Sequence, residues 1–205
     1  GKNLTKGNSP TYSSDVCLPT VGGTPNHMSI AFTGSPQDYF LLNTPLSTAT
    51  TNFVLEAFVK AVDSTSSARL VYNGSQFSSV NGFGFLDVNG VYEAAIGNGG
   101  SSLTTFGSAS ATTGWIHLAL VRDGSTATFY VNGVANATSS VAPTTPTGSF
   151  TIGTTGKIAG IDEVRFSTFS SGAFQASDLL YSVPEPSIFA FFIFGTSLLL
   201  LRRRQ

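Results

Sequence analysis

The chain carries very little charge. Only 10% of its 205 residues are Asp, Glu, Lys or Arg, against about 25% in an average protein. Residues 1–182 hold seven basic and ten acidic side chains, which gives a net charge of −3. This balance excludes the basic surface that nucleic-acid binding requires.

Cysteine is almost absent as well. The single residue, Cys17, excludes a disulfide within the chain, so a hydrophobic core has to supply the stability. We expect Cys17 to be inert or the remnant of a lost pair. The other interpretation is a reactive thiol, but that thiol needs an activating partner, and no histidine lies close to it in sequence.

Long apolar runs are missing except at the C-terminus, where residues 188–201 contain no charge. As a helix these fourteen residues rise about 21 Å, less than a hydrocarbon core of about 30 Å, so Ser187 and snorkelling arginines have to extend the span. The run follows an extended, accessible tetrapeptide, Val183, Pro184, Glu185 and Pro186. It precedes three residues that the positive-inside rule places in the cytoplasm, Arg202, Arg203 and Arg204.

The alternative is a buried C-terminal helix of a globular domain, but the run lacks the polar stripe of such a helix. The whole segment resembles the PEP-CTERM sorting signal of Gram-negative bacteria that produce exopolysaccharide. The resemblance implies export, recognition of Pro184, Glu185 and Pro186 by an exosortase, and transient anchoring in the inner membrane. Delivery to the cell surface or extracellular matrix would follow.

The remainder of the chain predicts an all-β fold, a two-sheet antiparallel sandwich. Short β segments recur about every ten residues between Gly, Asn, Ser and Pro clusters. Asn89-Gly90, Asp123-Gly124 and Asn132-Gly133 predict hairpin turns. Residues 172–180 predict a short surface helix. The expected strands are 29–32, 39–42, 52–62, 68–72, 82–88, 91–96, 115–122, 126–131, 134–138, 149–152 and 157–167, with weaker signals near residues 3–5 and 12.

Two of these segments alternate strictly. One face of each strand is predicted to be lined by Phe53, Leu55, Ala57 and Val59 and by Ile116, Leu118 and Leu120, or by their neighbours, with half of the residues facing inward. Trp115 is expected to fill the space between the sheets, or alternatively to form a platform for sugar stacking. Glu56 and Arg165 are expected to pair across strands at a sheet edge, with little gain in stability.

The order of the segments resembles a laminin-G-like, concanavalin-A-type jelly roll. Two positions depart from the family pattern, since Phe58 stands where tryptophan is usual and Thr33 where Asp is common. The first strand of the family is missing, and Gly1 is no initiator methionine, so we expect a processed chain or a fragment. The matching segments are 28–34, 38–39, 52–60, 114–124, 129–133 and 159–166.

We therefore expect four regions. Residues 1–180 form the jelly-roll domain, 181–187 the linker with the sorting motif, 188–201 the transmembrane helix and 202–205 a basic cytoplasmic tail. The fold often carries a calcium ion, and the resemblance implies Asp162, Gly34 and Asp38 as its site. The alternative is that Asp162 only accepts backbone hydrogen bonds in a turn.

Ligand binding is expected at aromatic residues of the concave face, Tyr72, Phe83, Phe85 and Tyr92, although strand aromatics are more often core residues. The acidic residues do not form the carboxylate run of related jelly-roll hydrolases. The first hypothesis is therefore a non-catalytic binding module for exopolysaccharide, another carbohydrate or a matrix protein. The alternatives are a self-assembling matrix subunit and a glycan hydrolase or lyase.

Overall fold

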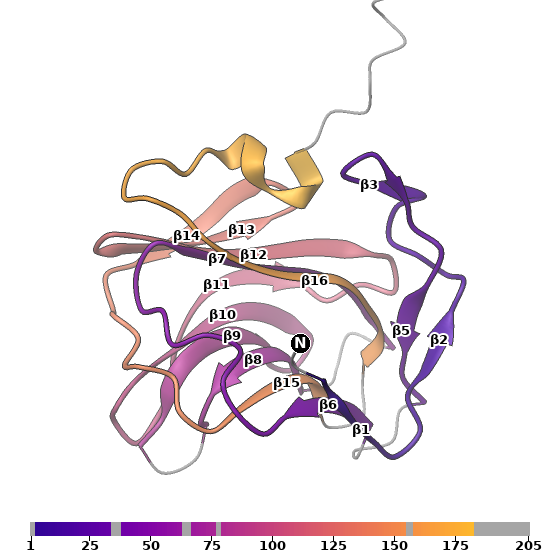
Figure 1. The fold of residues 1–205 in the computed structure, drawn as a ribbon, viewed down its shortest axis with the longest axis horizontal. Helices are drawn as coiled ribbons and strands as arrows, with labels where there is room; N and C mark the ends of the chain where they lie inside the picture. The colour runs from indigo at the N-terminus through magenta and orange to yellow at the C-terminus, as the bar shows by residue number, and fades with distance from the viewer. Residues whose placement is uncertain (1–2, 34–37, 63–66, 77–78, 155–157, 183–205) are drawn as a thin grey trace, which may run out of the picture.

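Two seven-stranded antiparallel sheets pack face to face in the computed structural model, which describes residues 3–33, 38–62, 67–76, 79–154 and 158–182 (Figure 1). Sheet 1 has the order β1 (Thr5–Gly7), β6 (Tyr39–Leu42), β15 (Ser149–Thr154), β8 (Ala68–Gly74), β9 (Asn81–Asp87), β10 (Val91–Asn98) and β11 (Thr104–Ser110). Sheet 2 has the order β14 (Val134–Ser139), β13 (Thr126–Val131), β12 (Ile116–Asp123), β7 (Phe53–Ala61), β16 (Ile158–Thr168), β5 (Ser29–Ala31) and β2 (Thr11–Ser13). A separate hairpin is formed by β3 (Thr20–Val21) and β4 (Thr24–Pro25).

The predicted two-sheet sandwich and its hairpin turns are confirmed. Asn89 and Gly90 both have positive φ, 54° and 81°, and connect β9 to β10; Asn132 and Gly133, at 49° and 75°, connect β13 to β14. Such a pair of left-handed residues is the two-residue turn that matches the twist of a hairpin. Gly124, with φ of 54°, lies in the third turn, between β12 and β13.

Strand β11 was not predicted from sequence patterns, and neither was the short hairpin of β3 and β4. The sequence of β11 is poor in β-branched apolar residues and is interrupted by Gly107. This glycine has φ of 83°, and a Cβ there would lie 2.3 Å from the Phe129 ring. Close packing between the sheets therefore requires glycine in the middle of the strand.

The main core lies between the sheets and is rich in phenylalanine. Phe53 of β7 stacks on Phe83 of β9 with ring centroids 4.0 Å apart, and Phe166 of β16 lies 5.9 Å from Phe53. Phe85 and Phe129 form another contact between the sheets, at 6.2 Å. Stacked and tilted aromatic pairs of this kind stabilise the core beyond their buried area.

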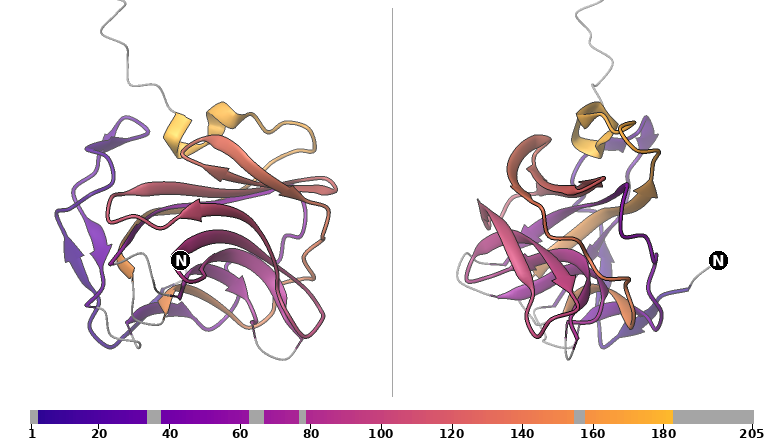
Figure 2. Two further views of the ribbon diagram at one scale, coloured as in Figure 1. Left: turned by 180° about the vertical axis from the view of Figure 1, so that it is seen from behind. Right: turned by 90° about the vertical axis from the view of Figure 1, so that its left-hand side faces the viewer.

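Phe53, Leu55, Ala57 and Val59 line the main core, which confirms the predicted alternation of β7, but the other face of this strand is buried as well. Val54, Glu56 and Phe58 point away from the main core but are 5%, 0% and 2% exposed. The chain after β16 returns across this face and packs Leu179 against Val54 in a second apolar cluster. Strand β7 is therefore covered on both sides, and Figure 2 shows the C-terminal turns lying over sheet 2.

The C-terminal segment forms two 3-10 turns, η1 (Ala176–Asp178) and η2 (Leu180–Ser182), in place of the predicted single surface helix. Leu179 is extended between them, with φ of −69° and ψ of 145°. Both Leu179 and Leu180 are buried, and the Leu180 N–H donates a hydrogen bond to Glu56 of β7 in sheet 2. A continuous helix could not insert two consecutive leucines into the same surface.

One open side of the sandwich is bridged by Asn136 of β14. Its amide accepts a hydrogen bond from the Ser108 N–H (3.0 Å) and donates one to the Ser108 carbonyl (3.1 Å). Since Ser108 belongs to β11, this side chain joins edge strands of the two sheets as a neighbouring strand would. The contact satisfies backbone groups that edge strands otherwise leave unpaired.

Candidate functional site

The outer face of sheet 1 carries a groove made of two adjoining cavities of about 280 and 330 Å³. Arg69 of β8 and Gln76 of the following loop line both cavities, so they mark the junction. The first cavity is also lined by Leu41, Tyr72, Gly74, Ser75, Gly148, Ser149 and Thr151. The second is also lined by Ser67, Ala68, Leu86, Asp87 and Val88.

Strand register explains which side chains reach the groove. Thr151 pairs with Leu41 on one side and with Tyr72 on the other, and Tyr72 pairs with Gly84 of β9. Residues directly opposite each other share a face, and Gly84 alternates with the core residues Phe83 and Phe85. The whole row therefore faces outward.

Tyr72 forms the floor of the first cavity. A Cβ at Gly84 would lie 2.7 Å from the Tyr72 ring, so the glycine leaves room for the ring to lie across β9. The Tyr72 hydroxyl donates a hydrogen bond to the Asn81 carbonyl (2.9 Å). Burial raises the pKa of Tyr72, so the phenol is neutral at physiological pH.

Two nitrogen-rich side chains lie at the junction of the cavities. Burial lowers the pKa of Arg69, although an arginine guanidinium stays charged at neutral pH. The Gln76 side-chain nitrogen is buried and has no hydrogen-bond partner in the described part of the chain. The groove therefore places the Arg69 guanidinium beside hydroxyl groups and an aromatic floor, a combination suited to a polar ligand.

The aromatic residues predicted to bind a ligand have a different environment. Phe83, Phe85 and Tyr92 are fully buried between the sheets, and Tyr72 is 1% exposed at the groove floor. The prediction took account of the type of each side chain but not of the sheet face toward which it points. Phe83 and Phe85 alternate with Gly82 and Gly84, a signal that phenyl rings occupy one face and glycines the other.

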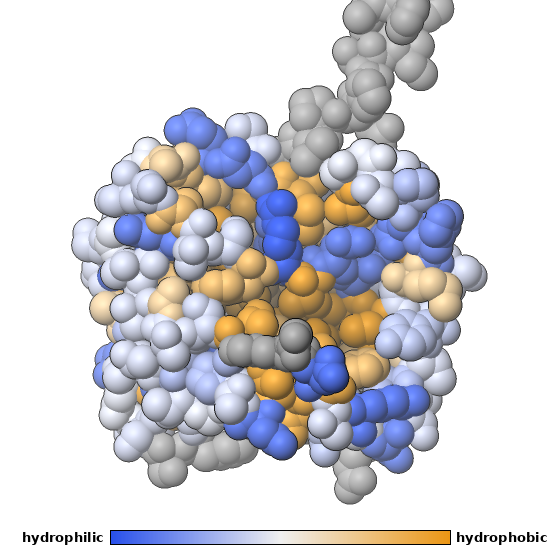
Figure 3. All heavy atoms as spheres, viewed as in Figure 1, coloured by the Kyte–Doolittle hydropathy of each residue, from blue (hydrophilic) through white to orange (hydrophobic). Residues whose placement is uncertain are grey.

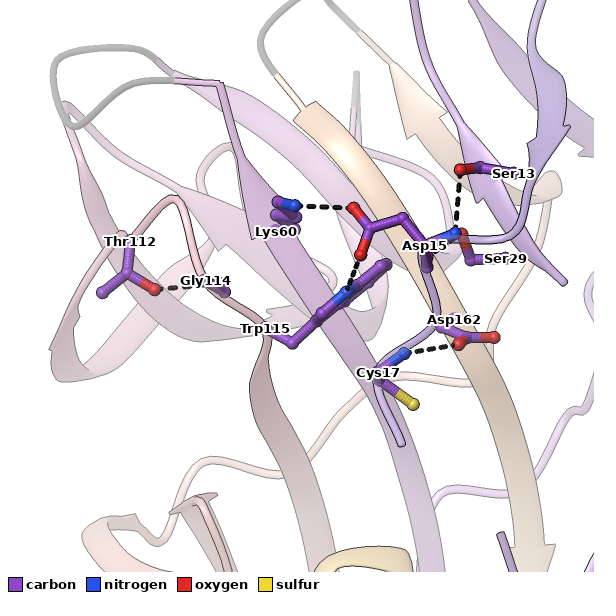
Figure 4. Close-up of polar contacts among 9 residues, drawn as sticks. All are labelled: Ser13, Asp15, Cys17, Ser29, Lys60, Thr112, Gly114, Trp115 and Asp162. Carbon is purple, nitrogen blue, oxygen red and sulfur yellow. Dashed lines mark hydrogen bonds and ion pairs between the residues drawn. The ribbon is translucent and has the colours of Figure 1, made fainter. Parts of the chain in front are cut away.

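Trp115 lies on the outer face of sheet 2, so the prediction that it fills the space between the sheets is wrong. It precedes β12 next to Lys60 and Gly160, and a Cβ at Gly160 would lie 2.8 Å from its ring. Its indole N–H donates to the Asp15 carboxylate (3.0 Å), which also binds the Lys60 ammonium (2.6 Å; Figure 4). The hydrogen bond from Lys60 lowers the pKa of Asp15 most, and the hydrogen bond from Trp115 lowers it further.

Asp162 of β16 anchors the N-terminal segment to the same face. One carboxylate oxygen accepts hydrogen bonds from the Cys17 N–H (3.0 Å; Figure 4) and the Asn26 amide (2.9 Å), and the other accepts the Glu163 N–H (3.0 Å). Burial, together with the nearby Asp162 charge, raises the pKa of the Cys17 thiol. The thiol is therefore protonated and a poor nucleophile at neutral pH.

Asp38 has a similar role before β6. Its two oxygens accept hydrogen bonds from the Asn8 amide (3.2 Å), the Ser9 N–H (3.1 Å), and the Thr33 N–H and hydroxyl (2.7 and 2.5 Å). Burial alone would raise the pKa of Asp38, but these donors lower it. The carboxylate is therefore held ionised, as a link between three segments.

Asp38 and Asp162 are the described residues of the predicted calcium site, and both are engaged with protein hydrogen-bond donors. Calcium prefers six to eight oxygen ligands, whereas Asp38 and Asp162 accept N–H and O–H donors and share no partner. No group of three His, Cys, Asp or Glu side chains suitable for a metal occurs in the described ranges. The third predicted position, Gly34, lies outside them, so calcium binding stays a prediction.

Glu56 forms a buried polar cluster on the outer face of sheet 2. Its carboxylate is 2.9 Å from His117 Nε2 and accepts the Leu180 N–H at 2.9 Å. It also binds the Arg165 guanidinium, which donates a hydrogen bond to the Asp178 carbonyl (2.6 Å). The expected pair of Glu56 and Arg165 is confirmed, but it lies at a central strand and clamps the C-terminal segment.

A β-bulge creates this cluster. The register of β16 against β7 shifts between Asp162, opposite Phe58, and Arg165, opposite Glu56. Glu163, within the shift, has φ of 49°, a left-handed conformation that is costly for a residue with a side chain. Because the extra residue reverses the alternation, Arg165 reaches the outer face beside Glu56 instead of the apolar core.

A smaller hollow of about 170 Å³ opens between the sheets. It is lined by Ile152 of sheet 1 and by Ile30, Ile161 and Val164 of sheet 2. Tyr12 and Met28, which are 66% and 56% exposed, stand at its rim. Apolar surface is visible between the two sheets in the space-filling view (Figure 3).

The predicted sorting motif (183–186), transmembrane helix (188–201) and basic tail (202–205) lie outside the described residues. In the part of the chain that the structure does describe, no helix is long and apolar enough to span a membrane.

Two antiparallel seven-stranded sheets with a groove on one outer face define a β-sandwich of the jelly-roll class. Residues 33–171 match the family model of the concanavalin A-like lectin/glucanases superfamily, Laminin_G_3, and the chain belongs to this family. The predicted laminin-G-like relationship is thereby confirmed. No curated protein is significantly similar to the sequence.

Solved structures agree on the fold. The binding domain of Paraclostridial Mosquitocidal Protein 1 superposes with a TM-score of 0.65 at 11% identity, over 89% of this chain and 46% of that one. Domain 4 of AbnA, an extracellular arabinanase from Geobacillus stearothermophilus solved with arabinotriose, gives 0.61 at 18% identity, over 84% and 82%. The binding domain of botulinum neurotoxin serotype G gives 0.59 at 10% identity, over 89% and 46%. The chain thus spans about half the length of the toxin binding domains.

Proposed function

We propose that the chain is a non-catalytic module that binds carbohydrate in the groove on sheet 1. The groove itself carries the proposal, because it combines a tyrosine floor with amide, guanidinium and hydroxyl groups. Its cavities approach or reach the lower end of the range of about 300–1,000 Å³ found for ligand sites. Support also comes from similar folds: the arabinanase domain was solved with arabinotriose, and the toxin domains are named binding domains.

The charged groups of the groove favour binding over hydrolysis. Glycoside hydrolysis uses two carboxyl groups that flank the scissile bond about 5–10 Å apart. Asp87 is the one carboxylate among the described residues lining the groove, and it is 3% exposed and accepts the Gly90 N–H. The buried carboxylates Glu56 and Asp162 lie on sheet 2, where Glu56 binds the Leu180 N–H and Asp162 binds Cys17 and Asn26.

A glycan array probed with the full chain in detergent tests the proposal. Thr151→Phe would fill the groove, so it should reduce binding at least tenfold. Thr128→Phe is the matched control, since Thr128 is a half-buried strand residue on the outer face of sheet 2. Equal binding by the two variants would locate the site elsewhere. A chain that binds no glycan and sediments as an ordered polymer would instead be a matrix subunit.

The delivery of this module is a second part of the proposal. Val183, Pro184, Glu185 and Pro186 would be recognised by an exosortase while residues 188–201 anchor the chain in the inner membrane of a Gram-negative bacterium. The module would then reach the cell surface or extracellular matrix and bind polysaccharide or a matrix protein there. The support is the order of extended motif, apolar run and three arginines.

Expression of the full chain with and without an exosortase tests this delivery. Mass spectrometry should find a shortened product only when the enzyme is present and Glu185 is intact. An unprocessed chain in both cells, or processing that continues in Glu185→Ala, would refute recognition of the motif.

A further inference from the structure

One end of the inner face of sheet 2 is not covered by sheet 1. Tyr12 pairs with Ile30, which pairs with Ile161, so these side chains share one face across β2, β5 and β16. Ile161 is 0% exposed in the main core, whereas Tyr12 is 66% exposed. Met28, two residues before Ile30, is 56% exposed. An apolar row that begins in the core therefore ends in solvent, at the side of the molecule where β2 and β5 stand (Figure 1).

The hollow of about 170 Å³ beside this row has the size of a single side chain. Its walls are aliphatic, from Ile152, Ile161 and Val164. An aliphatic cavity of about 150 Å³ holds a benzene ring, whereas sites for small-molecule ligands measure about 300–1,000 Å³. Burial of sugar hydroxyls against such walls would cost free energy. The hollow therefore suits one branched or aromatic side chain that belongs to a larger partner.

Glu163 adds a negative charge to the lining of this hollow. In the described ranges its backbone N–H donates to Asp162, but its carboxylate has no hydrogen-bond or ion-pair partner. Burial raises the pKa of the Glu163 carboxyl most, the Asp162 charge raises it further, and attraction to Arg165 lowers it in part. The Arg165 guanidinium itself binds Glu56. A cation placed beside Glu163 would therefore stabilise the ionised carboxylate.

Strand β16 also has an unpaired edge next to the hollow. On one side it pairs with β7 as far as Thr168, but on the other side β5 pairs only with Gly160 and Ile161. Residues 163–168 therefore face no hydrogen-bonded strand on that side in the part of the chain that the structure describes. Their exposure increases toward Ser167 and Thr168. A free edge of this kind can accept an extended peptide as an added strand.

We infer that this end of the sandwich binds an extended segment of a partner protein, which places one apolar side chain in the hollow and a neighbouring Lys or Arg beside Glu163. The aliphatic walls select the anchor, the carboxylate selects the charge, and the β16 edge accounts for an extended backbone. The site lies between the sheets, apart from the groove on sheet 1, and does not depend on carbohydrate binding.

Fluorescence polarisation of labelled seven-residue peptides tests the inference, with the full chain in lipid nanodiscs so that no detergent enters the hollow. The peptides carry alternating Thr and Val at the ends, Leu, Phe or Ser at the centre, and Lys, Gln or Glu beside the centre. A central Leu or Phe should bind about tenfold more tightly than Ser, because the hollow buries the apolar side chain. Lys beside the centre should improve binding about threefold over Gln.

Three variants locate the peptide. Met28→Glu puts a charge at the exposed rim and should weaken the Gln-containing peptides about tenfold. Val134→Glu is the matched control, since Val134 is 69% exposed on β14, at the opposite edge of sheet 2. Glu163→Gln should remove the preference for Lys over Gln and leave the Gln-containing peptides bound as before.

Several results would overturn the inference. Equal binding of peptides with central Leu and Ser, or binding that Met28→Glu leaves unchanged, would exclude the hollow as the anchor site. A preference for Lys that persists in Glu163→Gln would exclude the ion pair. If no peptide binds and the parent chain sediments as a dimer that Met28→Glu dissociates, the occupant is a second copy of the chain and not a partner segment. Glycan-array binding by Met28→Glu should equal that of the parent, so the proposed function is tested separately.

Discussion

Replacement of Glu56 by glutamine should destabilise the domain and release its C-terminal segment. The carboxylate is 0% exposed and contacts His117, Arg165 and the Leu180 N–H. Removing one partner of a fully buried ion pair costs about 3–5 kcal/mol, and one hydrogen bond to a charged group contributes about 1.5–3 kcal/mol. The Arg165 side chain is 41% exposed, so water compensates part of the loss, and glutamine keeps one acceptor oxygen.

We therefore expect Glu56→Gln to lower the free energy of unfolding by about 2–3 kcal/mol, a large share of the roughly 5–15 kcal/mol of a typical domain. Urea unfolding followed by far-ultraviolet circular dichroism measures this change. Hydrogen exchange at the Leu180 amide provides a local measurement, since that N–H should lose protection even below the unfolding transition. Both changes should appear together.

Asp15→Asn is the matched control on the same face of sheet 2. Asp15 pairs with Lys60, but its side chain is 55% exposed, so the loss should stay below about 1 kcal/mol. If Glu56→Gln unfolds within about 0.5 kcal/mol of the parent and the Leu180 amide stays protected, Glu56 does not hold the C-terminal segment. A larger effect from Asp15→Asn than from Glu56→Gln would contradict the assigned burial of the two clusters.

Three further changes test other parts of the structure. The folded state lowers the pKa of Asp38, so the ionised carboxylate stabilises the fold above the unfolded pKa of about 3.9, and this stability is lost as pH falls through the folded value. Asp38→Asn should therefore flatten the acid side of a curve of unfolding free energy against pH below about pH 5. An unchanged curve would exclude this role. Glu163→Gly should raise the free energy of unfolding by about 1 kcal/mol, because φ of 49° suits glycine. Glu163→Ala is the control and should bring no gain. Equal effects of the two variants in urea unfolding would show that the bulge is unstrained. Gly160→Ala should displace the Trp115 ring, which would lie 2.8 Å from the added Cβ, and should shift the fluorescence emission of this single tryptophan to longer wavelength. Unchanged fluorescence emission would contradict the packing of Trp115 on Gly160.

Much of the fold follows from local sequence. Asn-Gly pairs fix two hairpins because their residues tolerate positive φ, and alternation identifies strands such as β7 and β12. Alternation does not show that a distant segment covers the second face of a strand. Leu180 lies 124 positions after Glu56, so the burial of Glu56 and Phe58 becomes visible only in three dimensions.

The candidate site was less predictable than the fold. Trp115 was expected between the sheets because tryptophan is large and apolar. It lies instead on the outer face of sheet 2, beside Lys60 of β7 and Gly160 of β16. Arg69 precedes a register shift in β8, and Gln76 lies in a loop, so no simple period brings them together. Their common position depends on the pairing of β8 with β9, which sequence patterns do not specify.

The segment that returns over sheet 2 has a further consequence for how the domain can work. Residues 169–182 lie over the outer face of sheet 2 (Figure 2). The groove opens on the outer face of sheet 1. A ligand in the proposed groove and the segment 169–182 therefore lie on opposite sides of the sandwich, whose sheets are separated by about 10 Å. Occupation of the groove would therefore leave the contacts of residues 169–182 with sheet 2 intact.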